Sequence, residues 1–110
     1  MSSPVPSGPE ALAEKLGALA STPRLRILEA LAEQDLHVSE LARRMGMSRQ
    51  LLYLHLSKLE KAGCVAGTLQ LGADGKAVKT YRLLPFSMVL DIDTILAEMR
   101  AAPGDADVGQ

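Results

Sequence analysis

The sequence predicts a mainly helical domain with one small β-hairpin. Apolar residues recur with the helical period of about 3.6 as far as Gly63, and the period then shortens to about two, as in a strand. With 110 residues, of which 47% are hydrophobic and 23% charged, the chain can bury one modest core. We expect a single domain over residues 10–100, with disordered tails at residues 1–9 and 101–110.

The composition also limits where the protein resides and which sites it can carry. No apolar run approaches the roughly 20 residues of a membrane-spanning helix. The N-terminal residues lack a basic region followed by an apolar one, so we expect a cytoplasmic protein. Cys64 is the single cysteine, which excludes an internal disulfide and a zinc site built from several cysteines.

Two short helices are predicted at the start of the domain. The first covers residues 10–20, and because isolated helices of this length are marginal in water, it needs a partner surface from its own domain or from another chain. Its apolar face consists of Leu12, Leu16 and Leu19. The second covers residues 23–33, where a hydroxyl is available for capping and Pro23 is tolerated in the first turn. Residues 34–37 are interpreted as a connection.

A helix-turn-helix is predicted over residues 38–63. Ser39 is expected to cap its first helix, Gly46 allows the sharp turn, and Ser48 caps the second helix. The inner face of the second helix consists of Leu52, Leu56, Leu59 and Gly63. Its outer face is mostly polar and consists of Gln50, Tyr53, Leu54, Ser57 and Lys61. A helix-turn-helix presents such a face to the major groove of DNA, although an ordinary helical hairpin would show the same pattern.

A β-hairpin is predicted after Gly63. Residues 65–71 and 76–84 alternate in the manner of strands, and the Asp-Gly pair between them favours a tight turn. A helix-turn-helix followed by a hairpin is a winged helix. Lys76 and Lys79 lie near the tip of this wing and suit contact with DNA, although exposed turns often carry lysine for no such reason.

A last helix is predicted over residues 88–100, with Ser87 as its cap. Its apolar stripe consists of Met88, Ile92, Ile95, Leu96 and Met99. Such an apolar helix after the wing has no obvious place in a compact monomer. We therefore expect it to pair with its copy and with the first helix across a two-fold axis; docking onto its own core is the alternative.

The charges are unevenly distributed along the chain. Residues 41–82 hold eight basic and two acidic side chains, a net charge of +6, whereas the rest of the chain holds four basic and eleven acidic side chains. Basic charge therefore gathers around the helix-turn-helix and the hairpin, as contact with phosphates requires.

Four short motifs, in this order, resemble the ArsR/SmtB family of winged-helix repressors. They are the Pro-Arg-Leu-Arg-Ile-Leu start at residue 23, Glu-Leu-Ala at residue 40, the His-Leu-xx-Leu-xx-Ala-Gly run at residue 55, and Tyr-Arg-Leu at residue 81. The resemblance covers residues 12–84. It implies a homodimeric repressor that binds an imperfect inverted repeat and leaves it when an inducer binds.

The chain departs from the metal-sensing members of that family. Where some of them carry a Cys-x-Cys pair, this chain has His37-Val38-Ser39, and its last helix has carboxylates but no histidine. We therefore predict no metal site and no other cofactor. Cys64 is interpreted as a buried, inert thiol, since a disulfide switch would have to join two chains.

Leu54 stands at a position where many relatives carry arginine. Because leucine cannot hydrogen-bond to guanine, we expect Leu54 to contact a thymine methyl instead. The predicted base-reading residues are Arg49, Gln50, Tyr53, Leu54 and Ser57. The predicted phosphate contacts are Arg43, Arg44, Ser48, His55, Lys58 and Lys61. For His55, packing within the domain is an equally good interpretation.

These features predict a sequence-specific, DNA-binding transcriptional regulator whose partners are double-stranded DNA and a second copy of itself. An alternative is a winged-helix module for protein–protein interaction that has lost DNA binding, which the net charge of −1 and the apolar Leu54 favour. An enzyme is not expected, because the sequence shows no nucleophile with a base, no phosphate-binding glycine loop and no paired acid. The residues do not identify an inducer, whether small molecule or protein.

Overall fold

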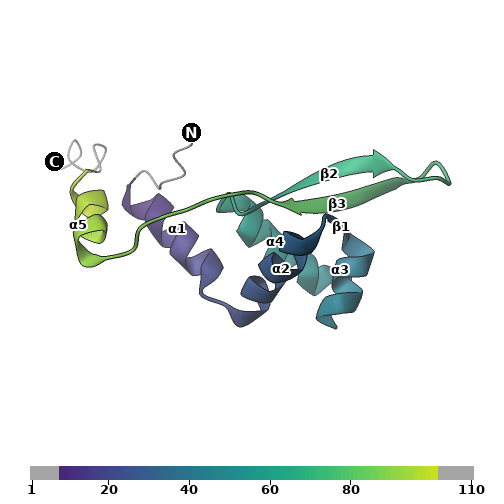
Figure 1. Ribbon diagram of the computed structural model, residues 1–110, viewed down its shortest axis with the longest axis horizontal. Helices are drawn as coiled ribbons and strands as arrows, with labels where there is room; N and C mark the ends of the chain where they lie inside the picture. The colour runs from purple at the N-terminus through teal and green to yellow at the C-terminus, as the bar shows by residue number, and fades with distance from the viewer. Residues whose placement is uncertain (1–7, 102–110) are drawn as a thin grey trace.

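A computed structural model of the protein describes residues 8–101 (Figure 1). The elements are α1 (Pro9–Leu19), α2 (Thr22–Glu33), β1 (Leu36–His37), α3 (Val38–Met45), α4 (Arg49–Lys61), β2 (Val65–Leu71), β3 (Ala77–Leu83) and α5 (Ile92–Arg100). The predicted winged helix-turn-helix is confirmed. Most of the two predicted disordered tails lies outside the described residues.

Capping groups explain where α2 begins and how it meets α1. Ser21 accepts a hydrogen bond from the backbone N–H of Arg24 at 3.3 Å, and a proline occupies the first turn. Arg24 in turn donates to the carbonyl oxygens of Ala18 at 2.8 Å and Gly17 at 3.3 Å. These are carbonyls at the C-terminal end of α1, where a positive charge is favourable. The Arg24 side chain therefore fixes the corner between the two helices.

The helix-turn-helix forms where the sequence predicts it, with one different cap. Gly46 ends α3 in the left-handed conformation, with a φ of 67°, and Ser48 caps α4 by accepting from the N–H of Leu51 at 3.1 Å. The prediction that Ser39 caps α3 is wrong. His37 holds the capping position without a side-chain hydrogen bond, because β1 leads directly into the helix.

The hairpin belongs to a three-stranded antiparallel sheet with the strand order β1-β3-β2. Residues 34–37 are therefore not a simple connection, since Leu36 pairs with Tyr81 and His37 with Thr80. The His37 Nδ1 atom lies 2.8 Å from the Thr80 hydroxyl, which donates to Gln70 at 3.2 Å. One side-chain hydrogen bond thus joins β1 to β3, and another joins β3 to β2. Together they link the wing to the start of α3.

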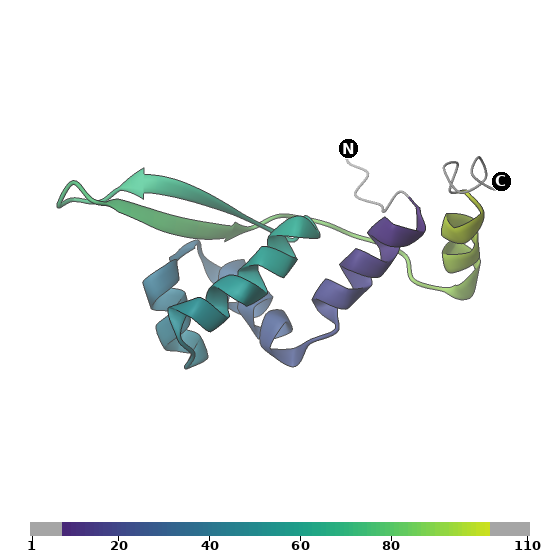
Figure 2. The ribbon, with the colours of Figure 1, turned by 180° about the vertical axis from the view of Figure 1, so that it is seen from behind.

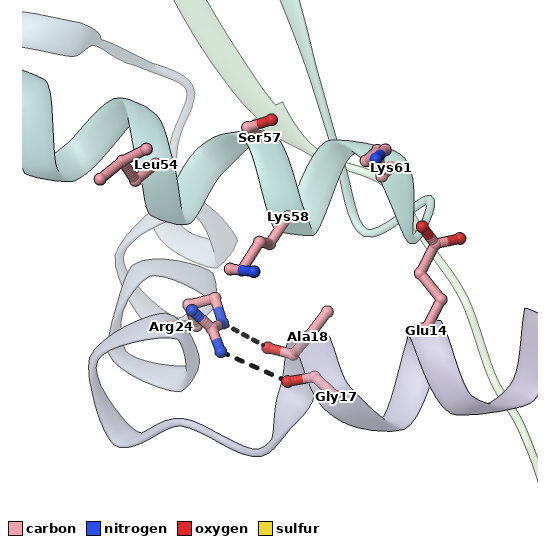
Figure 3. A pocket seen from close by; sticks show the side chains of 8 residues that line it. All are labelled: Glu14, Gly17, Ala18, Arg24, Leu54, Ser57, Lys58 and Lys61. Atoms are coloured by element: carbon pink, nitrogen blue, oxygen red, sulfur yellow. Dashed lines mark hydrogen bonds between the residues drawn. The ribbon is translucent and has the colours of Figure 1, made fainter.

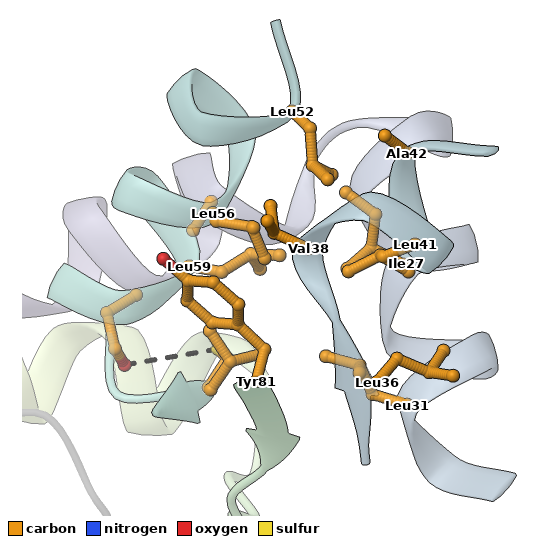
Figure 4. Close-up of a cluster of buried hydrophobic side chains, with 14 residues drawn as sticks. Ile27, Leu31, Leu36, Val38, Leu41, Ala42, Leu52, Leu56, Leu59 and Tyr81 are labelled. Carbon is orange, nitrogen blue, oxygen red and sulfur yellow. Dashed lines mark hydrogen bonds between the residues drawn. The ribbon is translucent and has the colours of Figure 1, made fainter. Parts of the chain in front are cut away.

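The core lies where α2, α3, α4 and the sheet meet (Figure 4). The most completely buried large side chains are Ile27, Leu41, Leu52, Leu56, Leu59, Cys64 and Val65. Tyr81, only 2% exposed, closes the core from the side of the sheet. The predicted inner face of α4 is confirmed for Leu52, Leu56 and Leu59, which are all fully buried. The prediction that Gly63 also lies on this face is wrong, because α4 ends at Lys61 and Gly63 is exposed.

The last helix is shorter than predicted and lies apart from the core. It begins at Ile92 rather than Met88, and Asp91 rather than Ser87 caps it, accepting from the N–H of Thr94 at 2.8 Å. Figures 1 and 2 show α5 beside α1 at one end of the molecule and the wing at the other end. The Cα radius of gyration is 16.7 Å, whereas a compact domain of about 100 residues has about 13 Å. The single chain is therefore elongated.

Candidate nucleic-acid interface

Helix α4 divides cleanly into a buried face and a free face. The buried face holds three leucines of the core. The free face holds seven exposed residues: Arg49, Gln50, Tyr53, Leu54, Ser57, Lys58 and Lys61. Tyr53 is 41% and Leu54 64% exposed. All five predicted base-reading residues therefore lie on a surface that a DNA groove could reach.

A groove of about 330 Å³ connects α4 with the wing. It is lined by Val38, Ser39, Arg49, Tyr53, Leu69, Ala77, Val78 and Lys79. The first residue of α4 and a lysine of β3 thus lie on one concave surface. The groove therefore places two positive charges together, Arg49 on the helix and Lys79 on the wing, which suits a nucleic-acid binding surface.

The two wing lysines are held differently. Lys79 is half-buried, and its ammonium lies 5.6 Å from the centre of the Tyr81 ring. Gly67 makes this packing possible, since a Cβ atom there would lie 2.7 Å from Cε1 of Tyr81 and 2.8 Å from Cε of Lys79. Lys76 is exposed beside the turn, where its backbone N–H donates to Asp74 at 3.0 Å. Of the two wing lysines, Lys79 is therefore held in position and Lys76 is exposed.

Arg43 and Arg44 are less available than their sequence suggests. Both form ion pairs with Glu40, one turn earlier on α3, and the Arg44 Nε atom lies 3.1 Å from the carboxylate. The hydrogen bonds from Arg43 and then Arg44 hold the pKa of Glu40 below its usual value. Glu40 lies just outside the segment with the net charge of +6. The positive field at α3 is accordingly weaker than the segment charge indicates.

His55 joins the recognition helix to α2. The Arg24 Nη1 atom lies 3.0 Å from the Nδ1 atom of His55. A guanidinium can only donate, so Nδ1 is the acceptor and the ring carries its proton on Nε2. Burial, followed by the charges of Arg24 and Lys58, lowers the pKa of His55. The ring is therefore neutral near pH 7 and positions α4, and only its Nε2–H remains to donate to a phosphate.

The buried thiol is not arranged for reaction. Cys64 is fully buried and contributes to the core. Burial raises its pKa, and the nearby charge of Lys15 opposes this shift more weakly. A thiol that is inaccessible and protonated is a poor nucleophile. The structure thus agrees with the interpretation of Cys64 as a packing residue.

The residues predicted to form a dimer interface differ in burial. Leu12 is buried at 5% exposure, and Leu16, Leu19, Met88, Ile95 and Leu96 are half-buried. Ile92 and Met99 remain exposed, at 64% and 43%. Met88 precedes α5 and is not part of its stripe. Ile92, Ile95, Leu96 and Met99 do recur along one side of the helix, as predicted.

Comparison with known proteins decides the family. The family model described as "Bacterial regulatory protein, arsR family" matches residues 21–66, from the cap of α2 into β2. An uncharacterised HTH-type transcriptional regulator of Methanocaldococcus jannaschii is 35% identical over 82 residues, which cover 74% of this chain and 85% of the relative. The chain belongs to the ArsR family. It is therefore a transcriptional regulator with a winged helix-turn-helix DNA-binding domain.

Solved structures share the fold of this ArsR-family chain. NolR from Sinorhizobium fredii is 31% identical with a TM-score of 0.58, covering 84% of this chain and 87% of NolR. Rv0081 of Mycobacterium tuberculosis is 32% identical with a TM-score of 0.57, covering 90% and 89%. A homodimeric winged helix-turn-helix domain from Mycobacterium bovis is 23% identical with a TM-score of 0.60, covering 89% and 80%.

The family assignment favours DNA binding over the alternative of an interaction module, and it describes a regulator rather than an enzyme. Within residues 8–101, no three His, Cys, Asp or Glu side chains are grouped as metal ligands would be. In that same part of the chain, no helix combines the length and apolar character needed to cross a membrane.

Two residues of this site gain roles that sequence reasoning missed. Arg24 matches a family motif, but its bonds to α1 and to His55 depend on three helices meeting, which no local pattern reports. The pairing of Glu40 with two arginines could have been found, because acidic and basic residues three and four positions apart on a helix lie close together.

Proposed function

We propose that this regulator is a homodimeric repressor that inserts α4 into the major groove of an imperfect inverted repeat. The observation that carries the proposal is the shared groove of Arg49, Tyr53 and Lys79 beside the exposed face of α4. A recognition helix flanked by a basic wing can contact bases and the adjoining backbone together. The protein would act in the cytoplasm, where its DNA partner is found.

Base contacts and phosphate contacts are assigned to different residues. Arg49, Gln50 and Tyr53 lie at the start of α4 and are assigned to base edges, with Ser57 and Leu54 further along the helix. The residues assigned to phosphates are Ser48, Arg43, Arg44, Lys58 and Lys61, with Lys76 and Lys79 of the wing. His55 is assigned a supporting role at most, because Arg24 occupies one of its ring nitrogens. Leu54 suits a thymine methyl.

Dimerisation is supported by apolar surface at the α1–α5 end. Val89, Leu90 and Ile92 are each more than half exposed, and no residue of α5 is buried. A second copy related by a two-fold axis would cover this surface and place two recognition helices roughly one DNA turn apart. The structurally similar Mycobacterium bovis domain is described as homodimeric, which supports the same arrangement here.

Selection from random duplexes, followed by binding measurements on the selected sequence, tests the proposal. We expect a partial inverted repeat that binds one dimer, with an affinity that falls steeply as salt is raised. Placing that sequence between a promoter and a reporter gene should lower expression when the regulator is present. Absence of binding to any duplex at low salt would contradict the proposal, and increased expression would contradict repression.

A further inference from the structure

A second concave surface of about 400 Å³ lies between α1, α2 and the C-terminal half of α4 (Figure 3). It is lined by Glu14, Gly17, Ala18, Arg24, Leu54, Ser57, Lys58 and Lys61. Three of these side chains are cations, and one is an acid. Its volume lies within the range of about 300–1,000 Å³ that is usual for small-molecule sites.

The charge of Arg24 in this pocket is bonded but not neutralised. Its three hydrogen-bond partners are two backbone carbonyls and the neutral imidazole of His55. A guanidinium has about five N–H donors, so about two remain for a ligand. Because the three bonds come from two helices, the group is held in place before any ligand arrives, which reduces the entropy cost of binding.

The pocket brings like charges together. Figure 3 shows the Lys58 side chain directed from α4 toward Arg24, and Lys61 lies one turn further along the same helix. In the described part of the chain, the only ion pairs within 4.0 Å join Glu40 to Arg43 and Arg44, so neither Arg24 nor these lysines has a carboxylate partner there. Neighbouring cations repel one another unless an anion lies between them.

Part of the pocket wall is apolar, at Gly17 and Ala18 of α1 and at Leu54 of α4. Ala18 and Leu54 contribute alkyl surface, and Gly17 leaves an opening, since a Cβ atom there would have no atom within 4 Å. Glu14 borders the pocket and would repel a polyanion that ran across it. A small ligand that combines one anionic group with a compact apolar body fits these features better than a continuous phosphate backbone.

We propose that this pocket binds a small organic anion, such as a phosphate monoester, and that the bound anion displaces DNA. Arg24, Lys58 and Lys61 hold the anionic group, while Leu54, Ala18 and Gly17 contact the apolar body. Competition with DNA rests on the proposed function, because four of the lining residues are assigned there to DNA contacts. Binding of the anion itself does not depend on that function.

Phenyl phosphate is a suitable probe, and phenol is its neutral match. Both would be titrated into the isotope-labelled full chain at constant ionic strength while backbone chemical shifts are recorded. We expect saturable shifts with phenyl phosphate at Gly17, Ala18 and Ser57, and none with phenol. No saturable shift at these residues would overturn the proposal. That result would leave DNA binding, and hence the proposed function, untouched.

Charge-matched variants separate a specific site from general attraction. Lys58→Gln and Lys76→Gln each remove one positive charge, but only Lys58 lines the pocket. We expect about tenfold weaker binding of phenyl phosphate to Lys58→Gln and unchanged binding to Lys76→Gln. Equal weakening in both variants would show attraction to net charge alone and would overturn the proposal.

A pocket-filling variant tests the competition with DNA. Gly17→Leu leaves the backbone carbonyl that accepts from Arg24 in place and directs a side chain into open space. We expect it to bind the selected duplex as the parent does but to resist release by phenyl phosphate. If Gly17→Leu folds yet loses DNA binding along with anion binding, the pocket receives a DNA phosphate and the free-anion proposal is overturned. If it does not fold, the Lys58→Gln titration decides.

Discussion

The inner face of α4 is packed into the core, whereas α5 has no buried residue. The apolar side chains that the helix-turn-helix and the wing do expose, such as Leu54, Leu69 and Leu71, lie on the free face of α4 and on the wing. Leu52, Leu56 and Leu59 on α4 are fully buried, while Ile92 on α5 is 64% exposed. The core that contains the inner face of α4 is formed entirely by side chains of this one chain. The exposed apolar side of α5 is the surface that we propose a second copy of the chain covers. If that proposal holds, different residues of one short chain carry folding and pairing.

Leu56→Ala should have the largest effect on folding. The Leu56 side chain is fully buried in the core. Truncating it removes buried methyl groups and leaves a cavity. We expect the free energy of unfolding to fall by about 2–5 kcal/mol, measured by denaturant titration. A loss that depended strongly on protein concentration would show that Leu56 belongs to the pairing region, contrary to the comparison.

Ile92→Glu should instead weaken pairing while leaving the helix-turn-helix folded. A carboxylate at this exposed apolar position would be buried without a partner in the dimer. We expect a monomer by sedimentation and a loss of affinity for the selected operator of about 100-fold, because two linked half-site contacts become one. Ala97→Glu, on the opposite side of the same helix, is the matched control and should leave a dimer. If both variants remain dimeric, α5 is not the interface.

Within the DNA-binding region, base-reading and positioning residues should behave differently. Gln50→Ala combined with Tyr53→Ala should reduce discrimination against altered half-sites by about 1–3 kcal/mol. Lys79→Ala should weaken binding to all duplexes alike. It should also reduce the slope of log affinity against log salt concentration by about one. Competition among duplexes of varied sequence measures both effects. Equal losses on every sequence for both variants would remove the distinction between the two classes.

The smallest expected effect is the pH dependence contributed by His55. Its pKa is lowered by burial and then by Arg24 and Lys58, so the unfolded chain takes up this proton first as the pH falls below 6.5. The contribution of neutral His55 to the free energy of unfolding should therefore be complete above pH 6.5 and be lost as the pH falls through the folded-state pKa of His55. Denaturant unfolding above and below this pH should show a smaller loss for His55→Gln than for the parent. An equal loss would assign the effect to other groups.

The sequence was a good guide where one segment carries its own signals. The left-handed Gly46, the Ser48 cap and the buried leucines of α4 follow from local spacing and turn chemistry, and the structure has each of them. The exposed face of α4 followed from the same helical period. These features need no knowledge of distant residues.

Features that depend on distant partners were missed. β1 is only two residues long, and it exists because Leu36 pairs with Tyr81, far along the chain. Ser87 and Asp91 both suit a helix cap, so local preference alone did not identify Asp91 as the residue that caps α5. The bonds of Arg24 to α1 and to His55 likewise require the assembled helices.

The most direct test of two separate regions compares duplexes that contain one or two copies of the selected half-site. Equilibrium titration at fixed salt would give the affinity and the number of chains bound. The account predicts that the parent chain binds the two-site duplex as a dimer, about 100-fold more tightly than the one-site duplex. It also predicts that Ile92→Glu binds both duplexes with the same weak affinity. Equal affinities of the parent chain for the two duplexes would contradict the division of the chain into a reading region and a pairing region.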